Sequence, residues 1–118
     1  MPKKDEATLL DIAKAARLVL VFMQDAPTKE KFLDDIKTQS SVLYQLTVIG
    51  EAVKRLSNEF RGQHPNVPWS LIAGMRDQLI HGYDTVDWDE VWNTAANDVP
   101  DLLVKLEPLL PTQSDSLQ

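Results

Sequence analysis

VLYQLTVIGEAVKRLSNEF, residues 42–60, carries the clearest helical pattern in the chain. Its apolar residues recur at steps of three and four: Val42, Leu46, Ile49, Val53, Leu56 and Phe60. This spacing puts one apolar seam along a single α-helix, where it faces other helices. Gly50 lies inside that helix, where glycine costs up to about 1 kcal/mol relative to alanine. A close approach of another helix at Gly50 would explain the cost.

Two helices are expected before this one. Asp5 is placed to cap the first, which runs to about Gln24 with an apolar stripe at spacings of three and four. Pro27 then breaks the chain, and Thr28 is a good N-cap for a short second helix. The polar run at residues 37–41 indicates a bend before the central helix.

Two more helices are expected after a proline-containing loop at residues 62–68. Pro68 suits the first turn of the fourth helix, because its missing N–H has no helical partner there. Asp87 can cap the fifth, with Glu90 as its capping-box partner, and Pro100 should kink or end that helix. Since no segment alternates as a strand does, the sequence predicts an all-α, up-and-down bundle of four to five helices.

Composition is consistent with one small domain. The 118 residues fit a single helical domain over residues 1–110, with a flexible tail at residues 111–118. The net charge of −6 argues against non-specific binding to duplex nucleic acid, which requires clustered lysine and arginine. The chain has no cysteine and no apolar run near the roughly 20 residues that span a bilayer. We therefore expect a soluble, cytoplasmic protein.

GMRDQLIHGY, residues 74–83, carries the chemistry of the chain. On a continuous helix Arg76 and His81 would lie about 140° apart, while Asp77 and His81 would be surface neighbours. Gly82 is expected to stop the helix, which puts His81 in the last turn, where the helix dipole favours its protonated form. The alternative from spacing alone is an ordinary surface helix with a buried histidine near its end.

The motif Arg-x4-His-x-Tyr, read here as Arg76, His81 and Tyr83, resembles that of the HEPN superfamily, and its HepT branch in particular. The match extends to Ile49-Gly50-Glu51-Ala52 and to Pro68-Trp69 before the motif, and to Val86-Asp87 and Val91-Trp92 after it. The resemblance covers roughly residues 9–110. This combination is specific, whereas Arg-x4-His alone would not be.

The resemblance implies an endoribonuclease toxin with a composite site at the cleft of a homodimer. A base must take the proton of a ribose 2′-hydroxyl, an acid must protonate the leaving oxygen, and a cation must stabilise the phosphorane. His81 and Arg76 supply these groups without a metal or cofactor, and two copies of His81 would divide the acid and base roles. The resemblance also implies a minimal nucleotidyltransferase antitoxin that adds AMP to Tyr83 and silences the enzyme.

Other polar residues have weaker assignments. Asp77 and Glu51 could support the site, although Glu51 could equally pair with Arg55 four residues later. Lys54, Arg55 and Arg61 could contact RNA phosphates or form a solvated face. His64 is expected to be a solvated loop residue, and Trp69 and Trp92 are expected in the core.

Two other functions fit part of the pattern. A non-catalytic helical partner, or substrate-binding subunit, of a nucleotidyltransferase would keep the dimer and the modified tyrosine but would not cut RNA. A histidine phosphotransfer bundle has this size, but it needs an exposed mid-helix histidine, and Gly82 directly after His81 speaks against it.

Overall fold

The computed structural model describes residues 2–82 and 85–111. The helical elements are α1 (Lys3–Met23), α2 (Lys29–Leu33), α3 (Ile36–Lys54), α4 (Asn58–Gln63), α5 (Trp69–Ala73), α6 (Met75–Leu79), α7 (Trp88–Asn93), the π-helix η1 (Thr94–Asp98), α8 (Val99–Leu106) and the 3-10 helix η2 (Glu107–Leu109). Two short strands, β1 (Ile80–His81) and β2 (Thr85–Val86), form an antiparallel pair. Apart from Pro111, the predicted tail lies outside the described residues.

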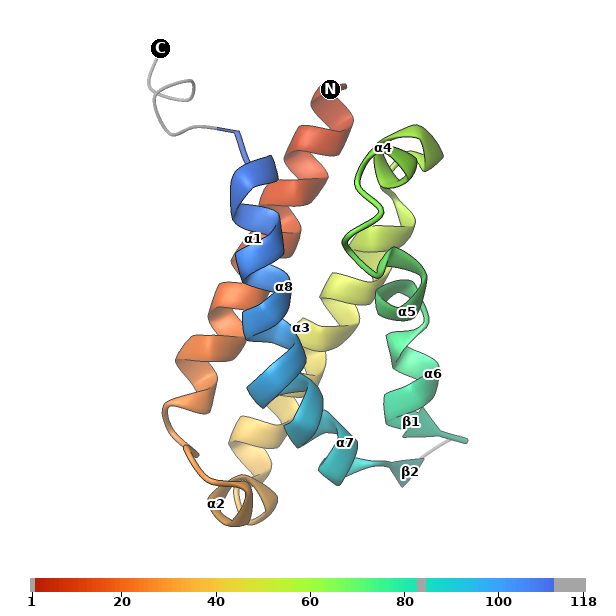
Figure 1. The fold of residues 1–118 in the computed structure, drawn as a ribbon. Helices are drawn as coiled ribbons and strands as arrows, with labels where there is room; N and C mark the ends of the chain where they lie inside the picture. The colour runs from red at the N-terminus through yellow and green to blue at the C-terminus, as the bar shows by residue number, and fades with distance from the viewer. Residues whose placement is uncertain (1, 83–84, 112–118) are drawn as a thin grey trace.

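The main helical segments run alternately up and down (Figure 1). α1 descends, α3 returns beside it, α5 and α6 descend again, and α7, η1 and α8 return. α1 packs on α3 and α8, and α3 packs on α5 and α6. The predicted all-α, up-and-down bundle is therefore confirmed, with one small hairpin that the sequence pattern did not indicate. Among the described residues, no helix is both long and apolar enough to cross a membrane.

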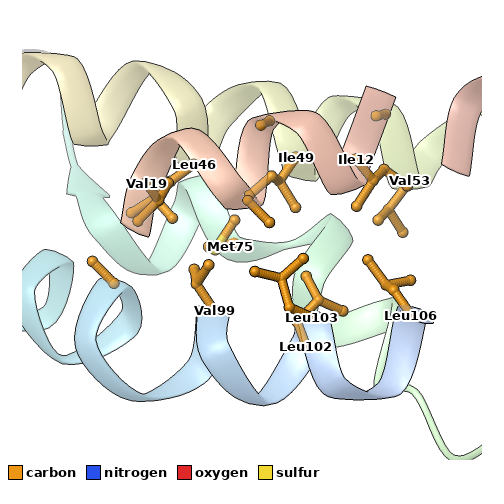
Figure 2. Packing of buried hydrophobic residues seen from close by; sticks show 14 of the residues in the cluster. Ile12, Val19, Leu46, Ile49, Val53, Met75, Val99, Leu102, Leu103 and Leu106 are labelled. Carbon is orange, nitrogen blue, oxygen red and sulfur yellow. The ribbon is translucent and has the colours of Figure 1, made fainter. Parts of the chain in front are cut away.

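The core lies where α1, α3 and α8 face one another. Figure 2 shows Ile12, Val19, Ile49 and Val53 directed toward the apolar side chains of α8, with Met75 of α6 pointing into the same space. The predicted stripe of the central helix is buried throughout, including Leu56 and Phe60. Burial of such side chains contributes about 1.5–3 kcal/mol each, so this seam contributes substantially to stability.

The predicted cap of the first helix is wrong. α1 begins at Lys3 with Pro2 at the N-cap, and Asp5 is buried in the first turn. The Asp5 carboxylate accepts hydrogen bonds from the backbone N–H (3.0 Å) and the hydroxyl (2.7 Å) of Ser57, which is the N-cap of α4. These bonds, the backbone one above all, hold the pKa of Asp5 below its ordinary value.

The predicted bend at residues 37–41 is also wrong, because these residues form the first turns of α3. Asp35 is the N-cap, and its carboxylate accepts hydrogen bonds from the N–H (3.0 Å) and hydroxyl (2.7 Å) of Thr38. Those bonds lower the pKa of Asp35. The polar sequence reflects capping and a buried Gln39 whose amide donates to a backbone carbonyl at the end of α2 (3.0 Å). The predicted Thr28 cap of α2 is confirmed.

The helix predicted over residues 42–60 is two helices. α3 ends at Lys54, and Ser57 caps α4 by accepting the N–H of Phe60 at 3.1 Å. The close approach predicted at Gly50 is confirmed, because a Cβ there would lie 3.2 Å from the carbonyl oxygen of Ile72. The bare Cα thus lets the last turn of α5 pack directly on α3.

Pro100 neither ends the last helix nor interrupts its course. α7, η1 and α8 follow one another without a gap, and Asp87 caps α7 as predicted, accepting the N–H of Glu90 at 3.1 Å. The π turn of η1 lies directly before α8, which contains Pro100. It widens the helix where proline has no N–H to donate to residue 96.

Candidate active site

Arg76 lies on α6, the short helix that follows Gly74. Met75 and Leu79, one helical turn apart, are buried against the bundle. This packing turns Arg76, Asp77 and Gln78 outward, and all three are exposed. The helix that the sequence predicted over this region is divided at Gly74 into α5 and α6.

His81 does not occupy the last turn of a helix, which corrects the sequence prediction. α6 ends at Leu79, and His81 lies on β1, paired in register with Thr85 of β2. Gly82 adopts a φ of 77°, the left-handed conformation expected of it, but it serves the hairpin rather than a helix end. The helix-dipole argument for His81 therefore does not apply.

The carboxylate beside His81 is Asp87, not Asp77. Nε2 of His81 lies 3.7 Å from Oδ2 of Asp87, and 57% of the His81 side-chain surface is exposed. The predicted Asp77–His81 neighbourhood is wrong because it required a helix through residue 81. The sequence marked Asp87 as a helix cap and as part of the Val86-Asp87 resemblance, and neither gave a sign of the histidine contact.

Arg76 and His81 lie on consecutive elements at the same end of the bundle, where α6 leads into β1 (Figure 1). Among the described residues, neither a hydrogen bond nor an ion pair joins them. Tyr83 lies outside the described residues. A cation and an imidazole are thus both accessible to a ligand at this end of the molecule.

The other predicted basic residues are elsewhere. Lys54 and Arg55 are at the end of α3 and Arg61 is on α4, toward the end of the bundle opposite the hairpin (Figure 1). Arg61 donates to the amide oxygen of Asn58 at 2.5 Å. Glu51 pairs with Lys54 at 3.3 Å rather than with Arg55. RNA that reached these residues on the same chain would have to extend along the bundle.

The aromatic side chains that the sequence singled out pack mainly in the core of the bundle. His64 is half-buried and its ring lies 4.6 Å from that of Phe60, so the predicted solvated loop histidine is wrong. Trp69 is buried as expected and donates to the backbone oxygen of His64 at 2.9 Å. Trp92 packs on Phe32 with ring centroids 5.7 Å apart, as expected for a core residue.

An apolar groove of about 300 Å³ lies beside the site, and the sequence gave no signal for it. Ile72 and Met75 line one side and Val99 and Leu102 of α8 line the other. Neither Arg76 nor His81 lines it. Within the described residues, no group of three or more histidine, cysteine, aspartate or glutamate side chains is placed to hold a metal ion.

Comparison with known proteins identifies the family. Residues 12–109 match the family model described as Ribonuclease HepT-like. A Thermococcus cleftensis protein named "Probable ribonuclease HepT" is 42% identical over 109 residues, which cover 92% of this chain and 98% of the relative. A Methanocaldococcus jannaschii protein, named as a candidate RNase, is 40% identical over 111 residues, covering 93% and 91%.

A third relative, from Caldanaerobacter subterraneus subsp. tengcongensis and also named as a candidate RNase, is 42% identical over 81 residues, covering 69% of this chain and 72% of its own. No solved structure gives a significant match. The family model alone spans most of the bundle, from α1 to η2. The chain therefore belongs to the Ribonuclease HepT-like family and is, by that membership, a nuclease that acts on RNA.

Proposed function

We propose that this chain is a metal-independent endoribonuclease toxin whose catalytic residues are Arg76 and His81, within one helical domain over residues 1–110. The observation that carries the proposal is the end of α6 at Leu79. Because the helix stops there, the motif arginine and histidine occupy consecutive elements and are both exposed at one end of the bundle. The alternative from spacing alone is a buried histidine, whereas the His81 side chain is exposed.

The two side chains match the steps of RNA cleavage. Neutral His81 takes the proton of a ribose 2′-hydroxyl, whose oxygen attacks the adjacent phosphorus atom. The bond to the 5′-oxygen breaks, and that oxygen receives a proton from an imidazolium. The Arg76 guanidinium offers forked donors to the phosphorane oxygens, whose charge is greatest in the transition state.

A homodimer would supply the second imidazole and enclose the site. With 57% of its side chain exposed, His81 in one chain has little shielding from water. Large apolar side chains also remain exposed, among them Ile36 at 78%, Val104 at 71% and Leu71 at 63%. An interface that covers such residues could bring two motifs into one cleft.

We also propose that a minimal nucleotidyltransferase antitoxin regulates this chain by adding AMP to Tyr83. The hydroxyl of Tyr83 would attack the α-phosphorus of ATP and release pyrophosphate, leaving AMP on the tyrosine. Tyr83 is one residue beyond the Gly82 turn, and the added phosphate would bring negative charge to the surface that carries Arg76. Membership in the HepT-like family supports this assignment.

RNA cleavage by the purified chain in excess chelator tests the proposal. The wild-type chain should cut a mixed RNA substrate in EDTA, and His81→Ala should lower the rate by about 100- to 10,000-fold. His64→Gln is the matched control, since His64 packs on Phe60 far from the hairpin. Failure of the wild-type chain to cut RNA in the chelator would contradict metal independence, and failure with magnesium present as well would favour the non-catalytic alternative.

A further inference from the structure

Asp87 is held by two elements and directs its remaining oxygen toward His81. Its backbone N–H donates to the carbonyl of Leu79 at the end of α6 (2.8 Å). Its Oδ1 accepts the N–H of Glu90 in the first turn of α7 (3.1 Å). Its Oδ2 lies 3.7 Å from Nε2 of His81. The carboxylate is therefore fixed before any ligand arrives.

We infer that Asp87 is a positioning residue for the proposed reaction: it holds the His81 imidazole through Nε2 and leaves Nδ1 to exchange a proton with RNA. The inference rests on the proposed function, because it assigns a role to the histidine of that site. A carboxylate facing one ring nitrogen favours a proton on that nitrogen, which fixes the tautomer. The contact at 3.7 Å is longer than a hydrogen bond, and such contacts commonly tighten when substrate binds.

The remaining charged groups around β1 do not occupy this position. The neighbouring strand β2 contributes none, and those on the adjacent helices are Arg76 and Asp77 of α6 and Asp89 and Glu90 of α7. Asp89 is paired with Lys29 at 2.9 Å. Among the described residues, Asp87 is the one charged partner within 4 Å of the His81 ring nitrogens.

The substitution Asp87→Asn tests the positioning role of Asp87 while it keeps a residue that can cap α7. Asparagine is as good an N-cap as aspartate, so its amide oxygen can still accept the Glu90 N–H. Its amide NH2 then replaces Oδ2 and can only donate to Nε2, which favours the opposite tautomer, with the proton on Nδ1. Asp89→Asn removes the same charge from the same turn of α7 without facing His81, and it serves as the matched control.

Two measurements on the 118-residue chain test the inference. Nitrogen-15 NMR of the neutral His81 ring should show the proton on Nε2 in the wild type and a larger Nδ1-protonated fraction in Asp87→Asn. On RNA in EDTA, kcat of Asp87→Asn should fall about 10-fold with KM unchanged. A buried aspartate–histidine pair loses roughly 10,000-fold in kcat on the same change. The loss here should be smaller because this contact is half-exposed.

The results can overturn the role of Asp87 without overturning the proposed function, and the reverse. An unchanged tautomer in Asp87→Asn, or equal changes in Asp89→Asn, would overturn it. So would a changed tautomer with kcat unchanged, since the contact would then do nothing for the reaction. If the wild-type chain does not cut RNA, the proposed function fails, and the tautomer measurement alone judges whether Asp87 orients His81. Thermal melting monitored by circular dichroism confirms that each variant is folded.

Discussion

The carboxylate of Asp5 and the N-cap Ser57 are joined by two hydrogen bonds across 52 residues of sequence. They tie the first turn of α1 to the start of α4, so one buried acidic group holds two helices together at one end of the bundle. A charged acceptor of this kind is worth more than a neutral one, because both bonds strengthen when the carboxylate is ionised.

We predict that Asp5→Ala lowers the free energy of unfolding at pH 7 by about 2 kcal/mol, since a charge-assisted pair of bonds is lost. Because the folded pKa of Asp5 is lowered, its contribution is present above the ordinary value of 3.8 and is lost as pH falls through the folded pKa. The gap between wild type and variant should therefore narrow in acid. Urea unfolding at several pH values measures this, and the exposed Asp11→Asn on the same helix should show no comparable gap.

Gly50 gives a second stability prediction. A methyl group there would lie 3.2 Å from the Ile72 backbone oxygen, which cannot rotate away. Gly50→Ala should therefore lower the free energy of unfolding by about 1 kcal/mol or more, despite the better helix propensity of alanine. Gly62→Ala is the control: nothing lies within 4 Å of its added Cβ, and it should stabilise α4 by up to about 1 kcal/mol. Equal effects in thermal melts would contradict the close approach.

Arg76→Ala should lower RNA cleavage by about 100- to 1,000-fold, because the phosphorane loses its forked donor. Arg76→Lys should recover only part of the rate, since lysine keeps the charge without the planar fork. Single-turnover cleavage at saturating RNA measures both. Arg17→Ala, an exposed arginine paired with Glu107, removes the same charge from another face and should leave the rate near wild type. A similar loss in Arg17→Ala would point to general RNA affinity instead.

Light scattering at micromolar concentration should give the mass of a homodimer. The exposed apolar side chains and the open setting of His81 both require a covering partner if the proposed composite site exists. Activity that persists in a monomer would remove the argument for two imidazoles from two copies. Cleavage rate per chain should also fall on dilution below the dimer dissociation constant.

The sequence predicted most of the bundle because apolar spacing reports which helix face is buried. It failed where a polar residue had two possible roles. Asp5 looked like an N-cap but bonds to Ser57, a partner that only the tertiary fold brings near. Asp77 looked like the neighbour of His81 because the pattern assumed a helix through residue 81. That assumption is wrong because Ile80 pairs with Val86 in an antiparallel hairpin. The sequence did not indicate the hairpin because two-residue strands are too short to give an alternating pattern.

The last prediction concerns Tyr83, the proposed AMP acceptor. Tyr83→Phe keeps the aromatic ring and removes only the hydroxyl that would attack ATP. We therefore expect the variant to fold and to cut RNA like the wild type, while escaping silencing by the nucleotidyltransferase. Each AMP on the wild type would add a phosphate that attracts Arg76 and repels RNA at short range, where salt screens weakly.

Intact-mass spectrometry after incubation with the transferase, ATP and magnesium measures the modification, and RNA cleavage before and after incubation measures silencing. Tyr44→Phe is the matched control, because Tyr44 is the other tyrosine of the chain and is exposed on α3. The wild type and Tyr44→Phe should gain AMP-sized mass and lose activity together, whereas Tyr83→Phe should do neither. A mass gain on Tyr83→Phe equal to that on the wild type would place the acceptor elsewhere. A mass gain on the wild type without loss of cleavage would separate modification from silencing, since an AMP group that leaves Arg76 and His81 accessible to RNA has no means of blocking the site.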